Sequence, residues 1–170
     1  MKTILQNRLS MSDIRSIVRN LDDQRFDELY SLLYDPDKRV SDNAAWVLTH
    51  LAAADRKWLT PHIEEMMDEA MKTTSITKCR LILDLLVMQP MDDVEVRTDF
   101  LDFCLEGLAN PANPSGLRAL MAKLAFTQCK DYPELLQELR TIFEMMEPHS
   151  LSPGMLCTRR NMLAKLDKRL

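Results

Sequence analysis

The chain carries few of the residue groupings that support catalysis or metal binding. Its three histidines, His50, His62 and His149, lie far apart in the sequence, and its four cysteines form no C-x-x-C pair. The chain also has no H-E-x-x-H, no G-x-S-x-G and no glycine-rich loop before a helical segment. Because nucleophile and metal sites need clustered side chains, we expect no enzymatic activity, no bound metal and no cofactor.

The cysteines and the apolar runs bear on the compartment. Cysteines 79, 104, 129 and 157 are widely spaced in helical segments, which is typical of reduced thiols in a reducing compartment. The first residues lack the apolar run and cleavage site of a signal peptide. The most apolar run, residues 81–88, is too short to span a membrane and contains Asp84. We therefore expect a cytoplasmic protein with no membrane contact.

The composition indicates an all-α fold. Only 3 of the 170 residues are glycine, which disfavours hairpin-rich β folds and loops that cradle phosphate. The 12 methionines and the many leucine, alanine, glutamate and lysine residues favour helix instead. The formal net charge of −4 gives the chain no general attraction for nucleic acid or anionic membranes.

Apolar residues recur in one helical pattern at regular steps. An i, i+3, i+4, i+7 stripe begins at Phe26 and recurs from Ile63, Leu101 and Leu139, at steps of 37, 38 and 38 residues. A second stripe follows each first one, and these begin at Ala44, Cys79, Leu117 and Arg159. Since a helix buries one such face, the pattern predicts four helix pairs in one domain, at about 23–58, 59–92, 93–131 and 132–170. Residues 1–22 are expected to hold an N-terminal capping helix.

Short polar and proline signals predict where the helices begin. Thr60-Pro61, Asn113-Pro114 and Ser152-Pro153 each place a capping side chain before a proline at the first helical position. The second helix of the first unit is expected over residues 40–54.

The stretch from Leu29 to Ala52 resembles a HEAT repeat. Its match is carried by a helix that ends at an Asp-containing turn, then by a valine, an alanine pair and two leucines. These residues are Leu32, Leu33, Asp35, Val40, Ala44, Ala45, Leu48 and Leu51. Ser41 stands where family members usually carry arginine directly after the valine. The resemblance, which is to HEAT and armadillo repeats, implies a right-handed α-α superhelix of about four antiparallel helix pairs.

Trp46 is the residue that departs most from the core pattern. On an ideal helix it points away from the face shared by Val40, Ala44 and Leu48. Its neighbours on that opposite face include Asp42 and His50. An exposed tryptophan is a common partner contact, but packing against the N-terminal helix is the more frequent arrangement.

The same face can be followed into the later units. It predicts Lys78, Leu81 and Leu85 in the second unit and Lys123 in the third. The HEAT resemblance implies that second helices line the concave side of the stack. The candidate partner-binding residues are therefore Asp42, Trp46, His50, Lys78, Leu81, Leu85 and Lys123. The leucines could equally fill contacts between repeats.

These patterns favour a noncatalytic scaffold that binds a protein or peptide on its concave face. One alternative is a nucleic-acid-binding protein, similar in fold to the HEAT-like DNA glycosylases of alkylation repair, with Trp46 and Asp42 as the nearest candidates. The acidic middle of the chain makes nucleic acid the poorer partner. Another alternative is a structural domain without a ligand groove. The sequence leaves the oligomeric state open.

Overall fold

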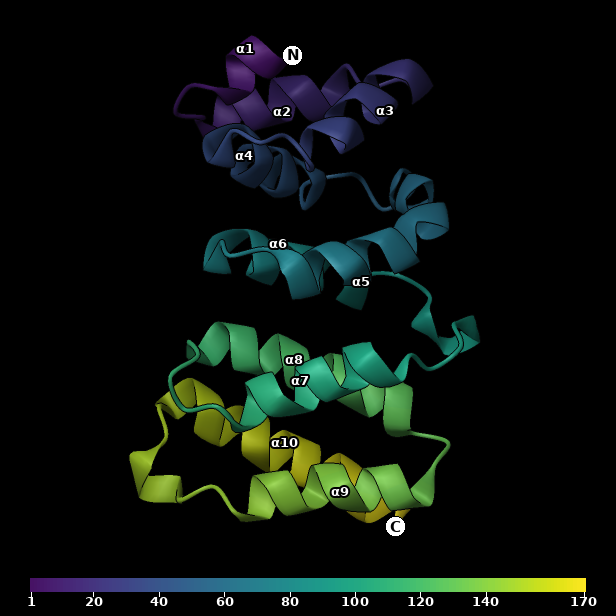
Figure 1. The fold of residues 1–170 in the computed structure, drawn as a ribbon, viewed down its shortest axis with the longest axis vertical. Helices are drawn as coiled ribbons and strands as arrows, with labels where there is room; N and C mark the ends of the chain where they lie inside the picture. The colour runs from purple at the N-terminus through teal and green to yellow at the C-terminus, as the bar shows by residue number, and fades with distance from the viewer. The chain divides into compact units, whose positions relative to one another are not determined.

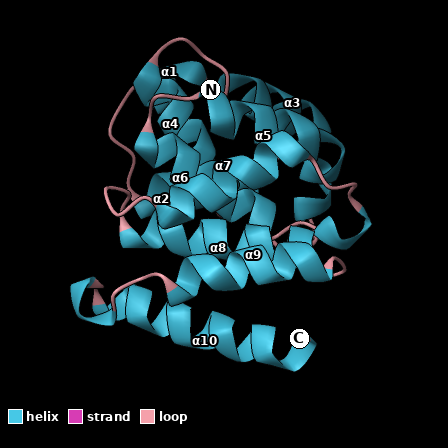
Figure 2. Ribbon diagram, turned by 60° about the horizontal axis from the view of Figure 1, so that its bottom comes forward, coloured by secondary structure: helices cyan, strands magenta, loops and turns pink.

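The computed structural model describes all 170 residues as helices and connecting loops, with no strand, which confirms the all-α prediction (Figure 1, Figure 2). The chain divides into two compact units, residues 1–89 and residues 90–170. No helix is long and apolar enough to cross a membrane.

The first unit holds six α-helices and one 3-10 helix. They are α1 (Lys2–Leu5), α2 (Met11–Arg19), α3 (Asp23–Leu32), α4 (Lys38–Leu48), the 3-10 helix η1 (Arg56–His62), α5 (Ile63–Lys72) and α6 (Ile76–Val87). Helix α3 packs on α4, α5 packs on α6, and α4 also packs on α6. Residues 1–22 form two short helices instead of the one that we expected, and both contact α4.

The second unit holds four α-helices and two short 3-10 turns. They are η2 (Met91–Asp93), α7 (Thr98–Ala109), α8 (Ser115–Cys129), α9 (Pro133–Glu144), η3 (Pro148–Ser150) and α10 (Pro153–Arg169). Helix α7 packs on α8 and α9 packs on α10, while α8 contacts both members of the second pair. Each predicted repeat thus contains one packed helix pair; the division into four repeats stays a prediction.

The apolar stripes form the core of each helix pair. The stripe from Phe26 is buried at all four positions, as are the stripes from Ile63 and Leu101. In the fourth predicted repeat Leu139 and Phe143 are fully buried, whereas Ile142 and Met146 are partly exposed. Burial of these faces supplies most of the driving force for pairing, because apolar area removed from water stabilises the fold by about 25 cal/mol per Å².

Several helix boundaries differ from the predicted ones. Helix α4 ends at Leu48 and not at residue 54. There Thr49 Oγ1 donates to the carbonyl oxygen of Trp46 at 2.6 Å, and His50 Nδ1 lies 3.0 Å from the same oxygen. Side chains that engage this carbonyl compete with the next helical N–H, so the chain leaves the helix and tightens into a turn.

Two of the three predicted caps are also replaced. Thr60 lies inside η1, and its hydroxyl donates to Gln89 Oε1 at 2.9 Å, so α5 begins only at Ile63. Asn113 uses its amide to donate to the carbonyl oxygen of Gly107 at 2.9 Å, which leaves α8 without a side-chain cap. Ser152 does cap α10, because its hydroxyl accepts from the N–H of Met155 at 3.2 Å.

Candidate functional site

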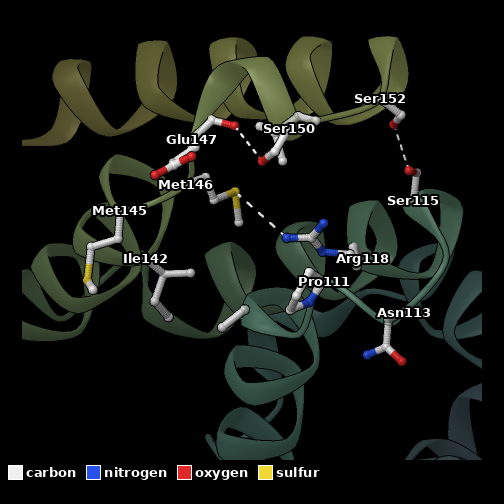
Figure 3. A pocket seen from close by; sticks show the side chains of 12 residues that line it. Pro111, Asn113, Ser115, Arg118, Ile142, Met145, Met146, Glu147, Ser150 and Ser152 are labelled. Carbon is white, nitrogen blue, oxygen red and sulfur yellow. Dashed lines mark hydrogen bonds between the residues drawn. The ribbon is translucent and has the colours of Figure 1, made fainter.

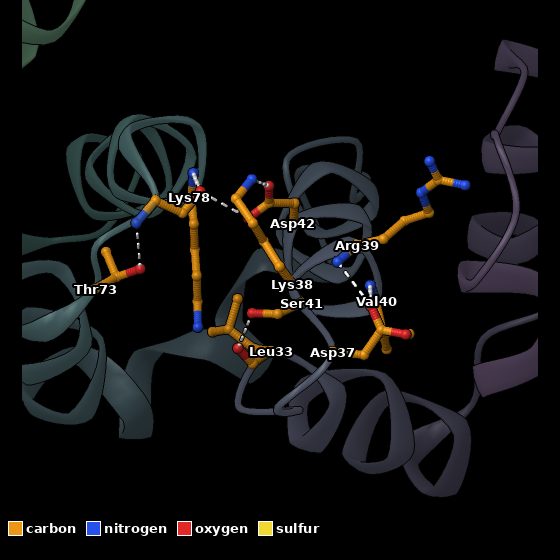
Figure 4. A network of polar contacts seen from close by, with 10 residues as sticks. Leu33, Asp37, Lys38, Arg39, Val40, Ser41, Asp42, Thr73 and Lys78 are labelled. Carbon is orange, nitrogen blue, oxygen red and sulfur yellow. Dashed lines mark hydrogen bonds and ion pairs between the residues drawn. The ribbon is translucent and has the colours of Figure 1, made fainter.

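Helix α4 carries two of the predicted binding residues, Asp42 and Trp46, and its first turn is held by short polar contacts (Figure 4). The carboxylate of Asp37 accepts from the N–H of Arg39 at 2.9 Å, which satisfies a donor that the helix itself leaves open. Ser41 is buried and donates its hydroxyl to the carbonyl oxygen of Leu33 at 2.6 Å, at the end of α3. These contacts set the position of α4 against α3 and thereby the outward face that carries Trp46.

Asp42 has a structural role in the first unit. Its carboxylate pairs with Lys38 at 2.7 Å and accepts from the hydroxyl of Ser75 at 2.9 Å. Ser75 is in turn the N-cap of α6 and accepts from the N–H of Lys78. Asp42 therefore ties α4 to the beginning of α6, and both of its carboxylate oxygens have partners within the unit.

Three predicted contact residues on α6 lie in the core. Lys78 and Leu81 are each 5% exposed, and Leu85 is 1% exposed. Lys78 Nζ pairs with Glu69 Oε1 at 2.6 Å and lies 5.8 Å from the centre of the Tyr34 ring. The reason for the burial is that α6 has α4 on one side and α5 on another, so little of its surface reaches solvent. These three side chains have little surface to present to a partner.

Trp46 and His50 do reach the surface. Trp46 is half-buried, and the exposed His50 ring meets it edge-on, with the ring centres 6.2 Å apart. The indole lines a cavity of about 350 Å³ at the junction of α4 with the segment that joins α1 to α2. The other lining residues are Asn7, Arg8, Leu9, Arg39 and Asn43. Packing of Trp46 near the N-terminal segment is thus combined with partial exposure.

Positive charge surrounds this cavity. Arg8 and Arg39 are exposed and form no ion pair; the one hydrogen bond of the Arg39 side chain is a 3.5 Å contact from Nη1 to the carbonyl oxygen of Gln6. Asn43 Nδ2 donates to the carbonyl oxygens of Leu5 at 2.8 Å and Asn7 at 3.1 Å, which fixes the linker beside α4. We call Arg8, Arg39 and Trp46 with their cavity the Trp46 surface. It can hold an anionic group beside an apolar one.

Our sequence reasoning did not assign Arg8 and Arg39 to this surface. One signal was present for Arg39, since positions 39, 43 and 46 lie on one helix face at i, i+4 and i+7. Nothing comparable marks Arg8, because the linker that carries it is placed by tertiary contacts. Lys123 is exposed on α8, in the unit of residues 90–170.

A second polar cluster in the first unit joins α3 to the beginning of α5. Tyr30 donates its hydroxyl to Glu65 Oε2 at 2.7 Å, and His62 Nδ1 lies 3.1 Å from the same oxygen. These contacts hold the pKa of Glu65 below its usual range, with the Tyr30 hydrogen bond as the larger cause. The Tyr30 ring stacks on His62 at 4.1 Å. These contacts connect Tyr30 on α3 with Glu65 in the first turn of α5.

The chain offers no cluster of three histidine, cysteine, aspartate or glutamate side chains that could hold a metal ion. All four cysteines are free; Cys79, Cys104 and Cys129 are buried, and Cys157 is exposed. Burial raises the pKa of the Cys79 thiol to about 11, which disfavours the reactive thiolate.

Comparison with known proteins agrees with this architecture. A family model described as a HEAT repeat domain matches residues 1–166, which is nearly the whole chain. Searches of curated proteins and of solved structures found no match. The paired helices, the buried stripes at near-constant steps and this match together show that the chain belongs to the HEAT repeat domain family.

Proposed function

We propose that the chain is a noncatalytic scaffold that binds a segment of another protein, and that the Trp46 surface is where the segment docks. The family supports the general role, because HEAT repeat domains are typically noncatalytic scaffolds that mediate protein interactions. The observation that carries the location is the pairing of a half-exposed tryptophan with two arginines that have no carboxylate partner. On this proposal the segment lies on the side of residues 1–89 that is lined by α4, the second helix of the first predicted repeat.

The chemistry of the surface selects the kind of segment. Arg8 and Arg39 favour carboxylates, which a guanidinium binds with two parallel hydrogen bonds. Trp46 favours an apolar side chain, since tryptophan provides a large rigid contact area with one donor. The proposed occupant is therefore an acidic segment with an aliphatic or aromatic residue. Lys78, Leu81 and Leu85 are buried, and Lys123 lies in the unit of residues 90–170, so none of the four belongs to the proposed docking surface.

Nucleic acid is the other anion that two arginines and a tryptophan could bind. Non-specific affinity for duplex DNA grows with the number of neutralised phosphates, and two cations supply few such contacts. Asp42, the carboxylate nearest to Trp46 in the sequence prediction, is occupied by Lys38 and Ser75. Protein is thus the better-supported partner. The free thiols suit a reducing compartment, and we propose that this compartment is the cytoplasm.

A pair of matched peptides tests the proposal. We would follow fluorescence polarisation of a labelled peptide of alternating glutamate and leucine, and of one with lysine in place of glutamate. The acidic peptide should bind, and Trp46→Ala or Arg39→Glu should weaken binding by about tenfold or more. Arg80→Glu makes the same charge change at an exposed position of α6 outside the cavity, so it should have little effect. Equal binding of the two peptides, or tighter binding of duplex DNA at the same salt concentration, would overturn the proposal.

A further inference from the structure

A cavity in the second unit lies apart from the Trp46 surface (Figure 3). It measures about 560 Å³, which is within the range of small-molecule sites. The walls come from the loop between α7 and α8, the start of α8, the end of α9 and the segment before α10. Ser115 and Ser152, at the first position of α8 and the N-cap of α10, join their hydroxyls at 2.6 Å.

Arg118 supplies the charge of this cavity. Its side chain lines the cavity although the residue is only 6% exposed, and it forms no ion pair with any carboxylate. Nε donates to the carbonyl oxygen of Leu108 at 2.8 Å, while the one contact of Nη2 is the sulfur of Met146 at 4.0 Å. Nη1 has no partner within the chain. Buried charges in proteins are normally paired, so Arg118 lacks the counter-charge that its burial calls for.

The rest of the lining divides into an apolar side and a mouth. Ile142, Met145 and Met146 present apolar surface, and Met145 is 78% exposed although it is a large hydrophobic residue. Methionine side chains adapt to varied apolar partners. Glu147 also lines the cavity, but its carboxylate is well exposed and lies 3.1 Å from His149 Nε2. One buried cation opposite one exposed carboxylate favours a singly charged anion over a doubly charged phosphate.

We propose that this cavity binds a small organic carboxylate with an apolar chain, whose carboxylate pairs with Arg118 and whose chain lies on Ile142, Met145 and Met146. Nη1 has no partner and Nη2 contacts only the sulfur of Met146, so the two nitrogens can meet both oxygens of a carboxylate, which is the geometry that this pair prefers. The amino ends of α8 and α10 add favourable dipoles for an anion. This site is independent of the Trp46 surface, and either can fail without the other.

Octanoate is the probe for this site, with octylamine as the matched cation and inorganic phosphate as the competing anion. Calorimetry should show that octanoate binds and that octylamine does not. In the two-dimensional N–H NMR spectrum, the Nε signal of Arg118, identified by its loss in Arg118→Met, should shift with octanoate. Equal affinity for octanoate and octylamine, or no octanoate binding at all, would overturn the site. Tighter binding of phosphate than of octanoate would overturn the choice of a carboxylate.

Three variants separate charge from packing. Arg118→Met keeps much of the side-chain volume and removes the charge, so octanoate binding should fall by about tenfold or more. Arg118→Met also removes the hydrogen bond to the carbonyl oxygen of Leu108, so a loss of binding could come from changed packing. Variants at two exposed positions of the cavity, Glu147 and Met145, leave the core intact. Glu147→Gln should strengthen octanoate binding, and Met145→Glu should weaken it. No change in either mouth variant, or full affinity in folded Arg118→Met, would contradict the proposal.

Discussion

Replacing Lys78 with methionine tests whether this lysine is a binding residue or part of the core. The ammonium and carboxylate of the Lys78–Glu69 pair lie 2.6 Å apart, and the two side chains are 7% and 15% exposed. Removal of one partner from a buried pair costs about 3–5 kcal/mol, because the remaining charge stays desolvated. Glu69 keeps some contact with water, so we expect Lys78→Met to lower the free energy of unfolding by about 3 kcal/mol.

The tryptophans make this measurement specific to one unit. Trp46 and Trp58 are the only two in the chain, and both lie within residues 1–89. Their fluorescence during a urea titration therefore reports the unfolding of the unit that holds the pair. Glu69→Met combined with Lys78→Met should recover most of the loss, since two neutral side chains of similar size leave no unpaired charge. Lys72→Met, at an exposed lysine on α5, serves as the control and should change little.

A small effect of Lys78→Met would refute the reasoning. If the variant stays within about 0.5 kcal/mol of the wild type, the size expected for an exposed residue, the ion pair does not stabilise the core. If, in addition, the acidic peptide no longer binds, Lys78 belongs to the binding surface.

Three further outcomes follow from the contacts described above. Ser41→Ala should cost about 1 kcal/mol in urea unfolding, because the buried carbonyl of Leu33 loses its donor. Glu65 has a pKa below its ordinary value of 4.5 in the folded chain, so its contribution to stability is present above that pH and is lost as the pH falls below it; Glu65→Gln should flatten the acid limb of a Tm-against-pH curve. Gly107→Ala would place a Cβ 2.3 Å from Met121 Sδ and should lower the free energy of unfolding of the second unit by about 1–3 kcal/mol, measured by circular dichroism.

The fold was predictable where a periodic apolar face decides the structure. The stripes from Phe26, Ile63 and Leu101 became buried helix faces, because any helix with such a stripe must cover it. Boundaries were predicted less well where one polar side chain changes the outcome. The end of α4 depends on Thr49 and His50 engaging a single carbonyl, and the start of α5 depends on Thr60 reaching Gln89, which lies 29 residues away. Sequence spacing carries no sign of such contacts.

Some of the candidate binding residues reach the surface and others are buried, and the reason is again a tertiary contact that the sequence does not show. Helix periodicity placed Trp46 on the outward face of α4, where the structure has it half-buried beside an arginine-lined cavity. The same periodicity also placed Leu81 and Leu85 outward, and there it was insufficient, because a helix between two neighbours buries more than one face. Arg8 joins the Trp46 surface only through the linker held by Asn43, which is a tertiary contact.

The fourth residue of the second helix has the same structural contact in two repeats, but in only one of them does the side chain keep donors that could bind a ligand. Ser41 holds this position in α4 and Arg118 holds it in α8, and each donates to a carbonyl at the end of the preceding helix. The side chain at this position projects back over the first turn, toward that carbonyl. Serine has one donor and uses it fully, whereas arginine has five N–H groups and uses one for closure. One donor is enough to bond this carbonyl, so α8 does not need an arginine for that contact. The remaining guanidinium donors face the cavity without a carboxylate partner, and they are the part of the side chain that a ligand can use.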